Sequence, residues 1–214
     1  MTSVSHQDLA LRLRDAYTQG VVAPLRDGLD PVDVAGAYAV QEINTRFWAE
    51  QGRRIVGRKA GLTAKAVQVQ LGVDQPDFGV LFDDMCVADG GILAAGSCIQ
   101  PKAEAEIAFV LGADLPSADT TPEQVAAAVA TVHAAIEIVD SRIADWKITF
   151  ADTVADNGSS AFFVLADEGK PLPGLDLWSA GMVMQINGET VSLGAGAAAL
   201  GHPLHDLHLK GPHD

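Results

Sequence analysis

Two glutamates alternate along a segment that is typical of a β-strand, QPKAEAEIAFVL at residues 100–111. Side chains of a strand alternate between its two faces, so Glu104 and Glu106 project from the same face, about 7 Å apart along the strand. Two carboxylates held that close repel each other unless a cation lies between them or one of them is protonated. The pair therefore indicates a cation site or, if that face is open to water, an ordinary solvated surface. The opposite face, which carries Ala103 to Leu111 at alternate positions, is expected to be core.

A third glutamate, Glu137, lies within the apolar run AAIEIV, which reads as a strand buried on both faces. An isolated carboxylate in such a place is costly, so it must be neutralised, paired or bound to a metal. Three carboxylates without a Cys or His ligand set favour a hard cation, Mg²⁺ or Mn²⁺ rather than Zn²⁺. The alternative is a salt bridge from Glu137 to Arg142 or Lys147.

A basic segment precedes these strands, RRIVGRKAG at residues 53–61, with four of the 14 basic residues of an acidic chain. Gly57 and Gly61 flank Lys59, so the backbone there can approach a ligand closely. A lysine near a carboxylate substrate can bind it or transfer protons. A solvated basic turn remains the alternative.

A loop with the sequence VDQPDFG supplies another candidate, Asp77. A loop aspartate can act as a general base if its pKa is raised or a water bridges it to the substrate. Turn residues surround Asp77, however, and an Asx turn is the better explanation of it from the sequence alone.

The elements that must position these side chains begin with helices. Leu9, Leu13 and Tyr17 recur at helical spacing, and Asp30-Pro31 is expected to start a second helix that runs to about Gln51. Further helices are expected over residues 64–71 and 121–133, and strands over 55–60, within 80–111, and over 135–139, 161–165 and 181–186. Asn187-Gly188 predicts a two-residue hairpin turn. Helices followed by many strands indicate an α+β fold.

The amino-acid composition argues against several classes of function. The 214 residues carry 28 acidic and 14 basic side chains, a net charge of −14, which disfavours binding to nucleic acid or to an anionic membrane surface. No apolar run reaches the roughly 20 residues that span a bilayer, and charged residues interrupt any signal-peptide core at the N-terminus. Two cysteines form no disulfide framework. We expect a cytoplasmic enzyme without a membrane segment.

Three segments together resemble the 2-hydroxypenta-2,4-dienoate hydratases of meta-cleavage aromatic catabolism, from about Leu9 to Leu204. They are GRKAGLTAKAVQVQLGVDQPDFGVLFDDMC, QPKAEAEIAFVL and AAIEIVDSRIADWKITFADTVADNGSSAFFV. These hydratases share a family with 4-oxalocrotonate decarboxylases and with the catalytic domain of fumarylacetoacetate hydrolases. The QPDFG loop is more similar to the hydratase branch.

The resemblance implies N-terminal helices followed by a mixed β-sandwich roll of the fumarylacetoacetate hydrolase type. It implies a divalent cation, Mg²⁺ or Mn²⁺, held by Glu104, Glu106 and Glu137, the three residues that the charge argument selects. Lys59 falls on the family's active-site lysine, and Asp77 on the acid of its loop. The resemblance also implies a homo-oligomer, for some members in a complex with the related decarboxylase.

The C-terminal end departs from the family pattern. After the motif GHPL at residues 201–204, the chain continues as HDLHLKGPHD, where family members continue for several tens of residues with strands that complete the sandwich. We therefore expect a C-terminally shortened roll, with a helical segment at 1–52, a catalytic domain at 53–204 and an atypical tail at 205–214. The histidines of the tail allow a metal-binding end, but a divergent or frame-shifted end explains them better.

The predicted activity is a metal-dependent hydratase that converts 2-hydroxypenta-2,4-dienoate to 4-hydroxy-2-oxopentanoate. Its partner is thus a small 2-oxo or 2-hydroxy acid substrate. The alternatives are a 2-oxo-3-enedioate decarboxylase or an acylpyruvate hydrolase of the same family. An inactive partner or scaffold subunit is a further alternative, suggested by the short C-terminus.

Overall fold

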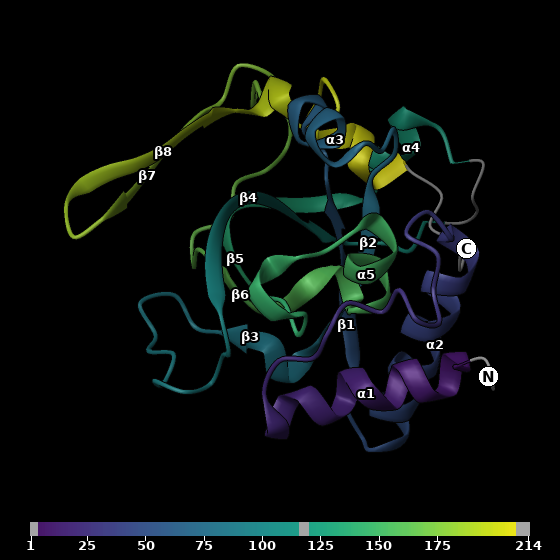
Figure 1. The fold of residues 1–214 in the computed structure, drawn as a ribbon. Coiled ribbons are helices and arrows are strands. Elements are labelled where there is room, and N and C mark those ends of the chain that lie inside the picture. The colour runs from purple at the N-terminus through teal and green to yellow at the C-terminus, as the bar shows by residue number, and fades with distance from the viewer. Residues whose placement is uncertain (1–3, 116–119, 209–214) are drawn as a thin grey trace. The chain divides into compact units, whose positions relative to one another are not determined.

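A computed structural model describes residues 4–115 and 120–208 of the chain. The chain forms two compact units. The first comprises Met1–Gly61, Pro76–Glu104 and Glu137–Phe163, and the second comprises Leu62–Gln75, Ala105–Ile136 and Val164–Asp214. Helices come first along the chain and strands dominate afterwards, so the predicted α+β class is confirmed (Figure 1). The predicted division at residues 52 and 204 stays a prediction.

The first unit begins with two helices, α1 (His6–Gln19) and α2 (Val34–Glu50). Ser5 and Asp8 form a capping box at the start of α1, which satisfies backbone N–H groups that have no partner within the helix. The prediction that Asp30-Pro31 starts the second helix is wrong. Asp33 caps α2 instead, because its Oδ1 accepts a hydrogen bond from the Gly36 N–H at 2.9 Å.

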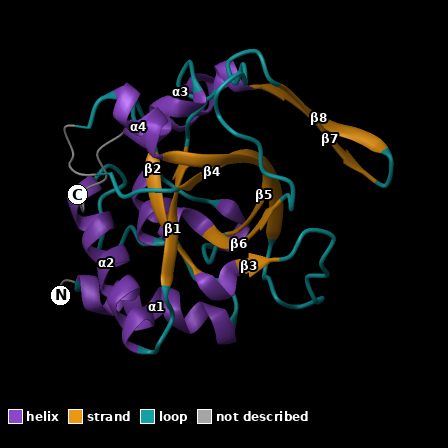
Figure 2. Ribbon diagram, turned by 180° about the vertical axis from the view of Figure 1, so that it is seen from behind, coloured by secondary structure: helices purple, strands orange, loops and turns teal. Residues whose placement is uncertain are grey.

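A small helical core holds these elements together. Helix α2 packs against α1, which lies next to it in Figure 2, and against α5 (Phe150–Ala155). Leu9 and Leu13 of α1 are buried as their spacing predicts, whereas Tyr17 is 50% exposed and Ala16 takes the buried position. This core anchors α5, which leads directly into the turn and the strand that border the candidate site.

Strands β1 (Ile55–Gly61) and β2 (Asp77–Phe82) form an antiparallel two-stranded sheet. In its register, Lys59 lies opposite Gly79, and Gly61 lies opposite Asp77. Directly opposed residues of an antiparallel pair share a face, as do residues two positions apart. Lys59 and Asp77 therefore project from the same face of this sheet, with the two glycines between them.

A four-stranded sheet has the order β3-β6-β5-β4. Its strands are β3 (Cys86–Val87), β4 (Pro101–Leu111), β5 (Val129–Asp140) and β6 (Ser160–Leu165). Strand β5 is not buried on both faces as predicted: Ile136 is 41% exposed while Glu137 is 6% exposed. The expected core face of β4 is also only partly buried, and Leu111 is exposed. The apolar composition of these strands therefore overstated their burial.

One helix is shorter than its sequence pattern predicts. Helix α4 begins at Pro122, is capped by Thr121 and ends at Ala128, whereas helix was expected to about His133. The segment from Val129 onward belongs to β5. Val129, Thr131 and Val132 are β-branched residues, which favour strand over helix.

The second unit contains α3 (Lys65–Leu71) and a hairpin of β7 (Gly181–Ile186) and β8 (Glu189–Ala195). Helix α3 ends at the left-handed Gly72. The predicted hairpin turn is confirmed, with φ of 54° at Asn187 and 84° at Gly188.

Short 3-10 turns complete the chain. They are η1 (Asp83–Met85), η2 (Ala144–Trp146), η3 (Asn157–Ser159), η4 (Gly196–Ala198) and η5 (Pro203–His208). The first four residues of the atypical tail lie in η5, and residues 209–214 lie outside the described part of the chain. Within that part, no helix combines the length and the apolar character that crossing a membrane requires.

Candidate active site

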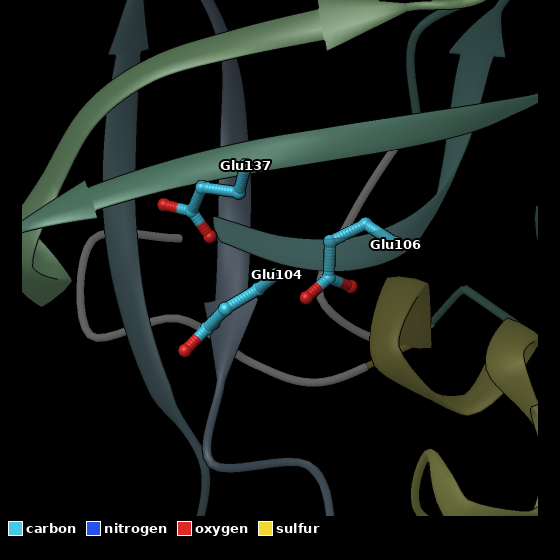
Figure 3. Close-up of side chains that lie close together, drawn as sticks. All are labelled: Glu104, Glu106 and Glu137. Atoms are coloured by element: carbon cyan, nitrogen blue, oxygen red, sulfur yellow. The ribbon is translucent and has the colours of Figure 1, made fainter. Parts of the chain in front are cut away.

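Three carboxylates converge at one point, as Figure 3 shows. Glu104 and Glu106 come from β4, and Glu137 comes from β5, the neighbouring strand of the sheet. One carboxylate oxygen from each residue can be chosen such that all three lie within 4.8 Å of one another. Glu137 is buried, whereas Glu104 and Glu106 are exposed. The three residues that the sequence selected are thus brought together, although they come from two separate segments.

This donor set fits a hard divalent cation. Oxygen ligands alone suit Mg²⁺ and Mn²⁺, which are bound by carboxylates and retain several waters. The electrostatics of the cluster point the same way. Surrounding protein desolvates the carboxyl of Glu104 and, together with the nearby charges of Glu137 and Asp77, raises its pKa despite the opposing effect of Lys59. A bound cation would relieve this cost because it stabilises the ionised carboxylates.

Lys59 is the cation that meets Glu137. Its Nζ lies 3.0 Å from Glu137 Oε1, and the two side chains are only 10% and 8% exposed. The same Nζ donates a hydrogen bond to the carbonyl of Gly158 at 2.9 Å. Burial alone would lower the pKa of Lys59, but the carboxylates of Glu137 and Asp77 outweigh it and raise that pKa. The buried lysine therefore stays protonated.

The alternative salt bridges considered for Glu137 do not form. Arg142 pairs with Asp156 at 2.6 Å, and Lys147 pairs with Asp145 at 2.8 Å. A solvated basic turn is likewise not the environment of Lys59, since its side chain is nearly enclosed.

Asp77 lies at the start of β2 and is 2% exposed, so it is not an exposed Asx-turn residue. Its buried Oδ1 has no hydrogen-bond partner among the described residues. Burial raises the pKa of Asp77 in spite of the positive charge of Lys59, and Glu137 raises it further. A carboxyl group with a raised pKa keeps its proton to a higher pH than an ordinary aspartate does, which suits general acid–base chemistry.

Sequence reasoning assigned no role to three further residues of the site. Ser160 Oγ donates a hydrogen bond to Glu137 Oε1 at 3.2 Å, and Gly158 accepts the hydrogen bond from Lys59. Asn157 binds the backbone of Val80 on β2. The dipeptide Asn-Gly in DNGSS signals a tight turn, but nothing local shows that this turn reaches Lys59.

A cavity of about 330 Å³ in the first unit does not include the cluster. Its lining reaches Asn157 and Ser160, but Lys59, Asp77 and the three glutamates are absent from it. The guanidinium groups in this lining already bind carboxylates: Arg53 binds Asp84, and Arg142 binds Asp156. The chemistry therefore belongs to the cluster around Lys59 and not to this cavity.

Comparison with known proteins agrees with this geometry. The family model described as "Fumarylacetoacetate (FAA) hydrolase C-terminal" matches residues 54–207. The chain belongs to the fumarylacetoacetate hydrolase family. The resemblance noted from the three sequence segments is thereby confirmed, and the matched range contains all five predicted site residues.

Individual members of the fumarylacetoacetate hydrolase family are close in sequence. The chain is 53% identical over 203 residues to 2-keto-4-pentenoate hydratase 1 of Dechloromonas aromatica (strain RCB), covering 94% of this chain and 77% of the relative. It is 51% identical over 206 residues to 2-keto-4-pentenoate hydratase of Paraburkholderia xenovorans (strain LB400), covering 96% and 77%.

A solved structure of this family has the same fold. 4-Oxalocrotonate decarboxylase from Pseudomonas putida G7, complexed with magnesium and adipate, superposes with a TM-score of 0.86 at 37% identity. The similarity covers 93% of this chain and 76% of the decarboxylase. The expected fumarylacetoacetate hydrolase type of fold is therefore confirmed.

Proposed function

We propose that the protein is a divalent-metal-dependent hydratase that adds water to 2-hydroxypenta-2,4-dienoate and forms 4-hydroxy-2-oxopentanoate in meta-cleavage aromatic catabolism. The observation that carries the proposal is the convergence of three carboxylates beside a buried lysine. It occurs in a chain about half identical to 2-keto-4-pentenoate hydratases over most of its length. The partner is a small 2-oxo or 2-hydroxy acid, and we expect a homo-oligomer.

Glu104, Glu106 and Glu137 would hold the cation, Mg²⁺ or Mn²⁺. When bound, it supplies Lewis acidity toward the adjacent carboxylate and 2-oxygen of the substrate and favours the enolate over the keto form. The magnesium-bound decarboxylase of the same fold supports this assignment. The buried position of Glu137 supports it as well, because it limits the water that competes for this ligand.

Lys59 would bind the substrate carboxylate or transfer a proton. Its Nζ remains protonated and has two protein partners, Glu137 and the Gly158 carbonyl. A rigidly held ammonium group next to the carboxylate cluster offsets part of the negative charge that an anionic substrate meets there. It also fixes the orientation of that substrate, which favours the reaction by lowering its entropic cost.

Asp77 would carry the proton. The dienol loses its 2-hydroxyl proton and gains one at C5, which gives the conjugated 2-oxo-3-enoate. Water then adds at C4 while C3 gains a proton, so the sum is the addition of one water. A buried carboxyl with a raised pKa is suited to accept and return these protons.

The test is the absorbance of the dienol in the presence of Mg²⁺ or Mn²⁺. We expect the wild-type protein to consume the dienol and to form 4-hydroxy-2-oxopentanoate. The double variant Glu104→Gln and Glu106→Gln should lose this activity, since neutral amides bind a hard cation weakly. A wild-type rate in the double variant would refute the role of the metal site.

Decarboxylation is the second candidate, because the superposed structure is a 4-oxalocrotonate decarboxylase. The same enolate stabilisation would serve the loss of CO₂ from a 2-oxo-3-enedioate. Supplying both substrates to one preparation separates the two activities. CO₂ release faster than dienol hydration would assign the protein to decarboxylation.

A further inference from the structure

The turn between α5 and β6 has an unusual backbone. Asn157, Gly158 and Ser159 have φ values of 57°, 61° and 55°, all in the left-handed region. Residues with a side chain rarely adopt this conformation, and here two of them do so on either side of a glycine. Something outside the turn must therefore hold it.

The side chain of Asn157 provides that hold. Its Oδ1 accepts a hydrogen bond from the Val80 N–H at 2.7 Å, and its Nδ2 donates one to the Val80 carbonyl at 2.9 Å. One amide thus satisfies both backbone groups of a residue that is 2% exposed. Asn157 takes the place of a neighbouring strand at this point of β2 and fastens the turn to the sheet that carries Lys59 and Asp77.

The fastened turn encloses Lys59 closely. A Cβ on Gly158 would lie 3.2 Å from Lys59 Cε and 3.4 Å from Asp77 Oδ2. A Cβ on Gly79, the residue opposite Lys59, would lie 2.6 Å from the Asn157 carbonyl oxygen and 3.1 Å from Lys59 Cγ. Glycines at these positions let the turn and the strand approach the lysine from two directions. As a result, the Gly158 carbonyl meets Lys59 Nζ at 2.9 Å.

We propose that Asn157 is a positioning residue of the reaction. It acts through Gly158: the amide clamp on Val80 fixes the left-handed turn, the turn directs the Gly158 carbonyl at Lys59, and this hydrogen bond holds the ammonium group beside Glu137. Asn157 itself touches none of the reacting atoms. The proposal rests on the proposed function, since it assigns Lys59 a part in hydration.

The test compares Asn157→Gly with Asn157→Ala. Glycine keeps the left-handed backbone accessible but removes the clamp, whereas alanine removes both. We expect kcat for dienol hydration to fall about 10- to 100-fold in both variants, because a small displacement of a group that orients the substrate has effects of this size.

Asn187 offers a matched control. It is also a left-handed asparagine, with φ of 54°, but it lies in the exposed turn between β7 and β8. Asn187→Gly should leave kcat within about threefold of wild type. Wild-type kcat in Asn157→Gly would overturn the proposal, because the backbone conformation alone would then suffice.

A second readout does not depend on activity. Acetic anhydride labels accessible lysines, and Lys59 should be protected in the wild-type protein because its side chain is 10% exposed. Labelling of Lys59 should rise about fivefold or more in Asn157→Gly as the turn opens, and should not change in Asn187→Gly. If the wild-type protein lacks hydratase activity, the proposed function fails, and unchanged labelling would then refute the clamp as well.

A milder variant covers the case in which the glycine or alanine variant does not fold. Asn157→Asp keeps the acceptor for the Val80 N–H and tolerates the left-handed backbone, but it turns a carboxylate oxygen toward the Val80 carbonyl. We expect it to fold, with kcat and Lys59 labelling between those of wild type and those predicted for Asn157→Gly. Wild-type values for both quantities would refute the proposal.

Discussion

Two buried groups of charged residues in the first unit each combine a basic side chain with carboxylates, but they differ in how completely their hydrogen bonds are satisfied. Arg142 is 1% exposed and binds Asp156 through its Nε and its backbone N–H, at 2.6 and 2.9 Å. Its remaining nitrogens donate to the carbonyls of Ser160 and Asp156 at 2.9 and 2.6 Å. Lys59 also meets a buried carboxylate, but the nearby Asp77 retains a buried oxygen without a partner among the described residues.

This difference separates a structural ion pair from a reactive site. Buried charges stabilise a fold only when the hydrogen bonds around them are complete, as they are around Arg142. An incompletely satisfied carboxyl costs stability, and such groups concentrate where proteins bind and convert substrates. Burial raises the pKa of Asp156 to about 6 as well, so a shifted pKa does not by itself mark the reactive group. What distinguishes Asp77 is a buried oxygen that has no partner in the described part of the chain and lies next to a lysine and a carboxylate cluster.

The largest effect on the hydration rate should come from replacing Lys59, the basic residue of the reactive site. We expect Lys59→Met to lower the hydration rate about 10²- to 10⁴-fold, the range that proton transfer and charge stabilisation contribute. Lys147→Met is the control, because Lys147 forms an exposed ion pair with Asp145. Steady-state assays with the dienol measure both. A rate for Lys59→Met close to that of Lys147→Met would exclude Lys59 from the reaction.

Replacing Arg142, the basic residue of the structural ion pair, should lower the stability of the fold. Arg142→Met leaves Asp156 buried without the guanidinium that compensates its charge and should lower the free energy of unfolding by about 3–5 kcal/mol. The exposed pair of Arg46 with Glu42 gives the control, and Arg46→Met should cost about 1 kcal/mol or less. Urea unfolding followed by circular dichroism measures the difference. Equal costs in the two variants would contradict the structural role of Arg142.

The hydrogen bond from Ser160 to Glu137 should increase the affinity of the carboxylate cluster for a metal ion. We expect Ser160→Ala to weaken Mn²⁺ binding about 10- to 100-fold, as loss of a group that orients a metal ligand does. Ser179 also donates to a carboxylate, that of Asp176, but on the surface. Ser179→Ala should therefore leave the affinity unchanged. Titration of Mn²⁺ by electron paramagnetic resonance distinguishes the two, and equal affinities would remove Ser160 from the site.

The smallest effect should be a gain in stability. Because burial raises the pKa of folded Asp77 above its value in the unfolded chain, ionisation near neutral pH destabilises the fold. Asp77→Asn should therefore unfold at a slightly higher temperature than wild type at pH 7, while its hydration rate falls. The difference should shrink as the pH is lowered toward 3.8, the ordinary pKa of an aspartate, and vanish below it, because Asp77 is then protonated in both states. Thermal unfolding at several pH values tests this, and a lower midpoint for Asp77→Asn would contradict it.

Much of the fold could be predicted because its signals are local. The hairpin at Asn187-Gly188 follows from two residues that favour left-handed turns, and the strand expected over residues 55–60 is found as β1. The predictions of secondary structure and burial failed where packing against other segments determined the outcome. Helix α4 stops at Ala128 because the next residues join a sheet, and Ile136 is exposed although it lies in the largely apolar segment AAIEIV.

Some features of the candidate site could likewise be predicted from the sequence, and others could not. Strand alternation was sufficient to place Glu104 and Glu106 side by side, and the cost of an isolated buried carboxylate was sufficient to demand a partner for Glu137. The choice of that partner was not encoded locally. Arg142 and Lys147 were the partners considered from the sequence, and the ion pair that forms instead joins Lys59 on β1 to Glu137 on β5.

The sequence by itself determined the types of the reactive groups, the pairing of two glutamates on one strand face and the family to which the chain belongs. Only the tertiary structure decided that Lys59 meets Glu137, that Asp77 is buried with an oxygen that no described residue binds, and that Asn157 holds Val80 across 77 positions of the chain. The physical reason is that the period of a strand or helix is a property of neighbouring residues. Burial and hydrogen-bond partners, in contrast, depend on which distant segments pack together.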